Sequence, residues 1–396
     1  MTTENSPEST GEPTSSEAAS PETAGPPAPE QEPLRSVHTS NLPEILDHFG
    51  ASVMVSTYQA GRLVMLRSQG GVLNTHFRSF DKPMGLAMTA GRLAVGAGTS
   101  IWEFHNMPAV CRKLDAPKEG EDPPAVPVQH DACFLPRTTH WTGDIQIHEM
   151  AWVGTGNEAE LWFVNTRFSC LCKRSETYCF DPVWRPSFIS GYVPGDCCHL
   201  NGLGLRDGRP RYVTALGESD EPGGWRDNKK DGGILIDLDS NEIIARGLSM
   251  PHSPRWYNDR LWVLESGRGG FGYIDLQTGK YENVVTLDGF TRGISFAGPL
   301  AFIGLSQVRE SAVFGGVPIA ERALEERTCG VWVVNIETGG VVGFVKFEDA
   351  VQEIFAVEVV GMRYPEIVND DRELLEGSFE LPDKALADVP PELRAN

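Results

Sequence analysis

The chain has 396 residues, 40% of them hydrophobic, and a formal net charge of −21. Nucleic acids and anionic membrane surfaces are bound by basic patches, so this acidic balance excludes both as partners. No apolar run approaches the roughly 18–20 residues that a membrane-spanning helix needs, so no membrane partner is expected.

The first 37 residues are rich in Glu, Pro, Ser and Thr. Such a composition cannot bury enough apolar surface to offset the entropy of ordering, so residues 1–37 are predicted to be a disordered acidic tail. The segment has neither the basic start nor the apolar middle of a secretory signal. The eight cysteines lack the paired spacing of a zinc site, and without an export signal they predict a reducing, cytoplasmic location.

Short strands separated by glycine-rich or polar turns follow in chain order from residue 52. Three strands are predicted near 52–56, 62–67 and 71–80. Five groups of four short strands come next, within 84–137, 150–190, 201–246, 253–287 and 293–347. One last strand at 353–360 precedes an acidic segment, 366–396, that is predicted to be flexible. Repeats of this kind indicate an all-β propeller.

A six-bladed β-propeller over residues 38–365 accounts for nearly all of these strands. The lone strand at 353–360 opens a sixth blade, while the three strands within 52–80 have no blade of their own. A ring must pair its ends or leave open sheet edges. The N-terminal strands are therefore predicted to pair with the last strand and to complete the sixth blade.

A short phrase recurs at the start of the blades, and three copies have a histidine in the same slot. These copies read HEMAW at 148–152, HLNGL at 199–203 and HSPRW at 252–256. Equivalent positions of a closed ring face one axis, so His148, His199 and His252 are expected to meet there. Neutral imidazoles that converge in a dry channel are ligands for a first-row divalent metal.

The sixth copy of the phrase places Glu353 in the same slot. We therefore predict one divalent transition metal, Zn or Fe, that is bound by the three histidines and leaves coordination positions open. Glu353 is predicted to be a fourth ligand or a catalytic base. The alternative is that each histidine makes a separate structural hydrogen bond, the commoner role of a single histidine at the mouth of a propeller.

Charged side chains next to the slot are the other catalytic candidates. Arg255 and Arg292 are suited to bind a carboxylate or an oxyanion. Glu149 is suited to act as a base or as the partner of a metal-bound histidine. The alternative for each is a salt bridge between blades.

Long insertions interrupt the repeats at 106–128, 218–231 and 307–328. Insertions in tight repeats usually cover one face and often bind a ligand, although they are also found as solvated loops. A small-molecule or peptide substrate is therefore expected beneath them.

Several phrases resemble a bacterial family of conserved hypothetical proteins that is catalogued as a domain of unknown function. They include FVNT at 163–166, CHLNGL at 198–203, YVTALG at 212–217, MPHSPR at 250–255 and RES at 309–311. The resemblance covers about residues 38–365, and it implies a propeller without an established activity. At the level of fold, the three histidines are similar in ligand type to those of peptidyl-hydroxyglycine amidating lyase, a propeller with zinc on its axis.

Two functions of different classes fit these observations. The first is a cytoplasmic metal-dependent enzyme, of unresolved reaction class, that acts on a small molecule or peptide at the channel axis. The second is a non-catalytic propeller scaffold that binds a protein partner through its face and insertion loops. In the second case the histidines are structural.

Overall fold

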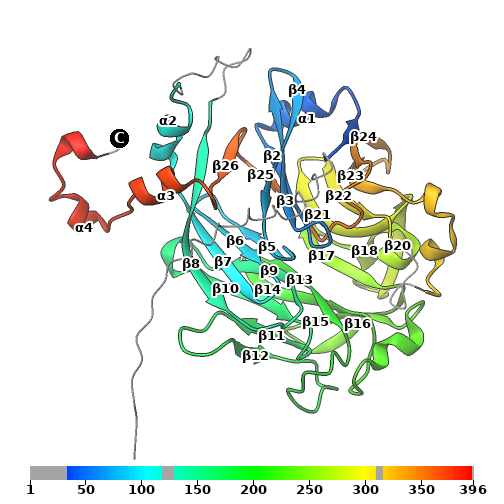
Figure 1. Ribbon diagram of the computed structural model, residues 1–396. Coiled ribbons are helices and arrows are strands. Elements are labelled where there is room, and N and C mark those ends of the chain that lie inside the picture. The colour runs from blue at the N-terminus through cyan, green and yellow to red at the C-terminus, as the bar shows by residue number, and fades with distance from the viewer. Residues whose placement is uncertain (1–33, 118–128, 309–314, 395–396) are drawn as a thin grey trace, which may run out of the picture. The chain divides into compact units, whose positions relative to one another are not determined.

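The computed structural model describes residues 34–117, 129–308 and 315–394, and within them the strands form six small sheets in a ring (Figure 1). The predicted six-bladed β-propeller is confirmed. The first strands of adjacent blades contact one another around the ring, so they line its axis. We number the blades from the first group of four consecutive strands, which makes the mixed N- and C-terminal sheet blade six.

Five blades use strands that follow one another in the chain. Blade one contains β5 (Leu86–Met88), β6 (Arg92–Gly96), β7 (Ser100–Asn106) and β8 (Ala132–Trp141). Blade two contains β9 (Ile147–Val153), β10 (Glu160–Asn165), β11 (Cys170–Lys173) and β12 (Asp181–Trp184). Blade three contains β13 (Leu200–Arg206), β14 (Arg209–Ala215), β15 (Gly233–Asp237) and β16 (Glu242–Leu248). Blade four contains β17 (Pro251–Tyr257), β18 (Arg260–Glu265), β19 (Gly270–Asp275) and β20 (Lys280–Thr286). Blade five contains β21 (Phe290–Ala297), β22 (Leu300–Ser306), β23 (Cys329–Asn335) and β24 (Val341–Phe347).

Blade six closes the ring by joining the two ends of the propeller. Its first strand is β25 (Ala356–Val360), which pairs antiparallel with β2 (Ser52–Thr57). The register sets Ser52 opposite Val360 and Ser56 opposite Ala356. The sheet continues outward through β3 (Arg62–Gln69) and β4 (Val72–Ser79). The predicted closure is confirmed.

Both ends of the described chain add a further strand to the outer edge of a blade. β1 (Ser36–His38) pairs with β24, and β26 (Pro365–Ile367) runs parallel beside β8. Residues 36 and 37, expected in the disordered tail, therefore form a strand, because the edge of blade five offers them backbone partners. Residues 34 and 35 are described without regular structure, and residues 1–33 of the expected tail lie outside the described residues.

The C-terminal segment also has regular structure where flexibility was expected. It contains α3 (Arg372–Gly377) and α4 (Asp383–Leu386), while α1 (Leu42–Phe49) and α2 (Cys111–Leu114) lie earlier in the chain. Ile367, Val368 and Leu374 are buried, and the last two pack in a cluster with Val110 and Cys133 near the edge of blade one. This apolar contact explains why the C-terminal segment packs against the propeller instead of extending into solvent.

Hydroxyl groups at the ends of second strands join several neighbouring blades. Ser56 donates to the carbonyl oxygen of Met84 at 2.5 Å, which links blade six to blade one. Thr166 donates to Leu200 at 2.6 Å, and Ser306 to Ile354 at 3.1 Å. Each acceptor lies at or just before the first strand of the next blade. These buried bonds therefore fix the positions at which the inner strands begin.

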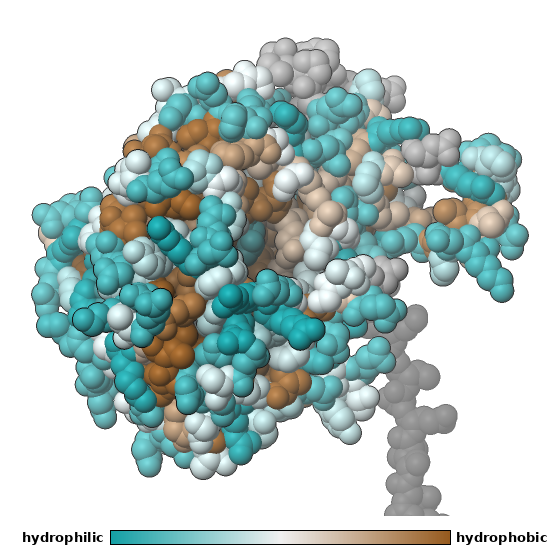
Figure 2. Space-filling model, turned by 180° about the vertical axis from the view of Figure 1, so that it is seen from behind, coloured by the Kyte–Doolittle hydropathy of each residue, from teal (hydrophilic) through white to brown (hydrophobic). Residues whose placement is uncertain are grey.

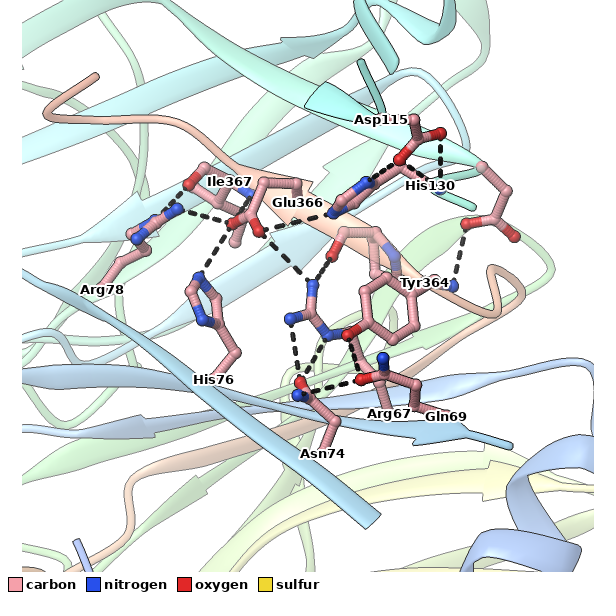
Figure 3. Close-up of polar contacts among 12 residues, drawn as sticks. Arg67, Gln69, Asn74, His76, Arg78, Asp115, His130, Tyr364, Glu366 and Ile367 are labelled. Carbon is pink, nitrogen blue, oxygen red and sulfur yellow. Dashed lines mark hydrogen bonds and ion pairs between the residues drawn. The ribbon is translucent and has the colours of Figure 1, made fainter. Parts of the chain in front are cut away.

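A buried carboxylate fastens β26 across blades six and one (Figure 3). Glu366 on β26 lies 3.0 Å from Arg78, 3.2 Å from His76 and 3.4 Å from Arg67, all on β3 or β4. His130, just before β8, lies 3.7 Å from its other side. Burial by itself raises the pKa of Glu366, but the bonds from His130 and His76 and the charge of Arg78 hold that pKa far below its usual range.

The face shown in Figure 2 carries mostly hydrophilic side chains, with apolar side chains visible between them. The core lies between adjacent blades, as in the cluster that joins Val55 of blade six to Phe302 and Val333 of blade five. On the face shown in Figure 2, the surface is recessed near the middle.

We predict that Glu366→Gln lowers the free energy of unfolding at pH 7 by about 3–5 kcal/mol, because removing one partner leaves buried cations unpaired. The pKa of Glu366 is lowered by folding, so its contribution is present above the unfolded value near pH 4.3 and is lost as the pH falls. The difference between variant and wild type in urea unfolding should therefore shrink between pH 5 and pH 3.5.

Glu376→Gln is the matched control, since its exposed carboxylate pairs only with the exposed Arg372 on the same helix. This variant should unfold at the same urea concentration as wild type. Equal unfolding curves for Glu366→Gln and wild type at pH 7 would contradict the role given to the buried carboxylate.

Candidate functional site

The inner strands of blades two and four begin with the same local structure. Gln146 and Met250 have left-handed backbones, with φ of 50° and 46°, and each lies two residues before a histidine. The carbonyl oxygen of Gln146 accepts a hydrogen bond from Nδ1 of His148 at 2.8 Å. The carbonyl oxygen of Met250 accepts one from Nδ1 of His252 at 2.9 Å. Such strained residues are typical of functional sites, and here they orient both rings.

These bonds determine which nitrogen of each ring carries the proton. A carbonyl oxygen only accepts, so Nδ1 is protonated in His148 and His252, and Nε2 keeps its lone pair. The hydroxyl groups of Thr166 and Ser266 lie 2.8 Å and 3.0 Å from the same Nδ1 atoms. Nε2 of His148 is buried, and among the described residues it has no hydrogen-bond partner.

His199 occupies the third copy of the slot in a different way. It lies just before β13 and is itself left-handed, with φ of 49°. Its Nδ1 lies 3.0 Å from both carboxylate oxygens of Asp196. Its ring lies 4.5 Å from the ring of Trp225, whose indole N–H donates to Asp196 at 3.1 Å. A carboxylate and an insertion loop therefore orient His199, in place of a backbone carbonyl.

The structure brings two of the three slot histidines into ring contact. The ring centroids of His148 and His199 are 5.0 Å apart, whereas the ring of His252 packs against Phe290 at 5.5 Å. In the ranges that the structure describes, no group of three or more His, Cys, Asp or Glu side chains is placed to hold a metal ion. A three-histidine metal centre is therefore not shown, and Zn or Fe stays a prediction.

The sixth copy of the phrase contributes an aromatic ring to the axis. Phe355 lies just before β25, and its ring centroid is 5.0 Å from that of His148. Glu353, predicted as a fourth ligand or base, is half-buried, and burial raises the pKa of its carboxyl group. Within the described part of the chain its carboxylate makes no hydrogen bond or ion pair. Its role as a ligand or base stays a prediction.

Arg292, the third residue of β21, is a buried cation on the axis. The residue is 9% exposed, and its guanidinium carbon lies 3.9 Å from the centre of the Phe355 ring. The same ring contacts His148, so the guanidinium and the imidazole share one aromatic neighbour. No acceptor for a hydrogen bond or ion pair from this guanidinium is found among the residues that are described.

Ionisation at the axis follows from this burial. Burial lowers the pKa of Arg292 to about 9, against an opposing effect of Glu149. Burial, and then the charge of Arg292, lowers the pKa of His148 and of His252 well below the usual value. At neutral pH the site therefore has two neutral imidazoles and one charged guanidinium. Chemically these are a general base and a group that stabilises an oxyanion.

Glu149 and Arg255 form a salt bridge between blades two and four. Arg255 Nη1 lies 2.8 Å from the Glu149 carboxylate. Both residues also satisfy the open edge of β13, because Glu149 accepts from the N–H of Leu203 at 2.8 Å and Arg255 donates to its carbonyl at 3.3 Å. The observed contact is the inter-blade salt bridge that the sequence left as the alternative for these residues.

The sequence-based candidates omitted Glu358, an acidic residue near the salt bridge between Glu149 and Arg255. It lies in β25 and its carboxylate is 4.0 Å from Arg255. It lines a cavity of about 260 Å³ formed by the later parts of the inner strands. An acid in the middle of an apolar strand, AVEVV at 356–360, is the signal that identifies it in the sequence.

The insertions of blades three and five meet over the ends of the inner strands that bear the histidines. One buried cluster joins Trp225 of the first insertion to Val317 and Ile319 of the second, together with Met250 and Phe290. Trp225 also contacts His199. The expected covering of one face is thus seen for these two insertions. Residues 118–128 and 309–314, which include the RES phrase, lie outside the described residues.

These features define a six-bladed β-propeller with a partly covered, polar axial site. The chain belongs to the family described as domain of unknown function DUF4915, whose model matches residues 40–368. The family resemblance inferred from the sequence is thereby confirmed.

Two solved structures are similar to the chain in fold. A chain from the crystal structure of a nidogen/laminin complex aligns with a TM-score of 0.50 and 10% identity, over 80% of this chain and 100% of the other. A Bacteroides caccae protein of unknown function aligns with a TM-score of 0.46 and 9% identity, over 78% and 99%. No curated protein matches the sequence significantly. Among the described helices, none combines the length and apolarity needed to cross a membrane.

We predict that Arg292→Met raises the free energy of unfolding at pH 7 by about 1–4 kcal/mol, because a buried cation without a partner is destabilising and Met keeps most of its volume. Folding lowers the pKa of Arg292, so the unfolded chain binds more protons above pH 9 and wild-type stability gains with pH there. The advantage of the variant should therefore shrink between pH 8 and pH 10 in chemical unfolding.

Arg255→Met is the matched control, because Arg255 has a carboxylate partner. It should destabilise the protein, since Glu149 is then buried without its cation. Destabilisation by Arg292→Met at pH 7 would contradict the view that Arg292 lacks a partner in the free protein.

Proposed function

We propose that the protein binds a small hydroxylated carboxylate at the capped end of the propeller axis. The observation that carries the proposal is the buried guanidinium of Arg292, which has no described acceptor and lies beside neutral imidazoles. A buried cation is costly unless an anion compensates it, so a ligand carboxylate is the natural partner.

The imidazoles define the second requirement of the ligand. Nε2 of His148 is a buried acceptor without a described donor. A ligand hydroxyl group donates to such an atom, whereas a second anionic oxygen is repelled by its lone pair. A carboxylate for Arg292 and a hydroxyl for His148 together describe a hydroxy acid.

The same two groups support a reaction class. A neutral imidazole next to a guanidinium is suited to remove a proton close to a carboxylate, while the cation stabilises the charge that develops on oxygen. We therefore propose proton abstraction as the chemistry of the site if the bound hydroxy acid is a substrate.

A divalent metal is the second candidate at this position. It is supported by the histidines themselves, since Nδ1 bonded to a carbonyl or carboxylate and a free Nε2 are typical of metal-bound imidazoles. The charge of Arg292 opposes it, because a guanidinium repels a dication in a dry site.

Calorimetric titration with D-glycerate, propionate and glycerol tests the first candidate. Glycerate should bind with saturation, whereas propionate lacks the hydroxyls, glycerol lacks the charge, and both should bind at least tenfold more weakly. Arg292→Met should weaken glycerate binding by about 10–100-fold, the effect of losing hydrogen bonds to a charged group. Binding should also decline as the pH rises above 9, where the guanidinium loses its proton.

Arg372→Met is the control, because Arg372 is exposed on α3, and it should bind glycerate as wild type does. Equal affinities for propionate and glycerate would contradict the proposed hydrogen bond between the ligand hydroxyl group and His148. Equal binding by Arg292→Met and wild type would overturn the proposal.

Elemental analysis of protein purified without a metal-affinity tag tests the metal. A metal shared by the histidines predicts stoichiometric Zn or Fe, a melting temperature lowered by a chelator, and strongly non-additive effects of His148→Ala, His199→Ala and His252→Ala. The hydroxy-acid site predicts metal-free protein, no effect of the chelator and glycerate binding in its presence. Stoichiometric metal would favour the second candidate.

A further inference from the structure

A second polar site lies on the later parts of the inner strands, beyond the positions of the histidines. His148 and His252 are the second residues of β9 and β17, whereas Trp152 and Trp256 are the sixth residues of the same strands. The two tryptophans line the cavity of about 260 Å³ that also contains Glu358. The cavity is formed mainly by apolar side chains, including Met150, Leu203 and Leu205.

The charged groups of this cavity are unevenly paired. Glu149 and Arg255 neutralise each other at 2.8 Å, and both also bond to the backbone of Leu203. Glu358 lies 4.0 Å from Arg255, which is beyond hydrogen-bond distance. The charged residues that line the cavity are Arg255 and Glu358, and Arg255 is bonded to Glu149 instead. Among the described residues, Glu358 is therefore left without a hydrogen-bonded cation.

The other cations beside the tryptophans pair with acids other than Glu358, Arg92 with Glu103 and Arg206 with Asp207. Arg92 and Arg206 lie over the rings of Trp152 and Trp256, each at 3.8 Å from the ring centre. Arg92 also pairs with the carboxylate of Glu103 at 3.1 Å. On β21, the strand beside β25, Ser295 is the polar group that faces Glu358.

We propose that this cavity binds a protonated primary amine carried on a short apolar chain, with the ammonium group paired to Glu358. The ammonium supplies the cation that the carboxylate lacks, and its three N–H donors match carboxylate oxygens. The methylene groups pack against Trp152, Trp256 and the leucines. The proposal uses other residues than the hydroxy-acid site and does not depend on it.

Proton release accompanies this binding. Burial raises the pKa of Glu358 to about 7, Glu149 raises it further and Arg255 opposes the rise. A bound ammonium favours the ionised carboxylate and therefore lowers this pKa. At pH 7 a fraction of a proton per site should leave Glu358 as the amine binds, and at pH 8.5 release should be small.

Titration with n-butylammonium chloride, in two pH 7 buffers that differ in enthalpy of ionisation, measures binding and proton release together. We expect saturable binding with proton release, and at least tenfold weaker binding of n-butanol, which has the same chain without the charge. Glu358→Gln should weaken butylammonium binding at least tenfold and abolish the proton release. Glu282→Gln, an exposed acid on β20, should behave as wild type.

Thermal unfolding and glycerate titration of Glu358→Gln provide the check on folding. Removing a half-buried acid with a raised pKa should not lower the melting temperature, and glycerate binding at Arg292 should be retained. Failure of glycerate binding in wild type would overturn only the hydroxy-acid site. Equal binding of n-butanol and butylammonium, equal binding by Glu358→Gln, or no saturable binding would overturn the amine site.

Discussion

The axial site depends on the pairing of β2 with β25, because this pairing converts a row of sheets into a ring. Five residues of each strand pair in register, and they come from opposite ends of the propeller. Without this closure the inner strands share no axis, and residues such as His148 and Arg292 have no reason to approach one another. At the outer edge, Glu366 joins blade six, through Arg67 and Arg78, to blade one, through His130.

Closing a ring creates a second constraint at the axis, where each inner strand has one edge without a strand partner. Charged side chains satisfy part of that edge, as Glu149 and Arg255 do for Leu203. Charges at the axis therefore fall into two kinds. Those bonded to backbone and to each other complete the fold. Arg292 has no ion-pair partner among the described residues, and Glu358 is 4.0 Å from the guanidinium that Glu149 already binds, so these two residues define where a ligand can bind.

The fold was largely predictable from the sequence, because turns, short strands and the repeated phrase recur from blade to blade. The closure followed from the count of strands and from the rule against open edges. The site was predictable only in part. The repeat identified His148 and His252 as equivalent, but it did not show that His199 has a left-handed backbone and is oriented by Asp196. It also selected Glu353 and omitted Glu358, because the slot rule considers position along the phrase and not the face of the strand. Which charges are paired depends on bulges and distances between blades, and these are not readable from one sequence.

The buried and charged residues along the axis favour an anionic ligand at one position and a cationic ligand at the other. At the end with the histidines, the charge of Arg292 keeps the imidazoles neutral and favours an anion. At the later end, the carboxylate of Glu358, which has no hydrogen-bonded cation among the described residues, favours a cation. The low dielectric around the buried Arg292 strengthens the first preference, because this charge is little screened by bulk water. A divalent metal at the histidines is repelled by the positive charge of Arg292, whereas a carboxylate at the same position neutralises that charge. The electrostatics of the free protein thus favour opposite ligand charges at the two positions, and they do so with charged residues that the closure of the ring does not require.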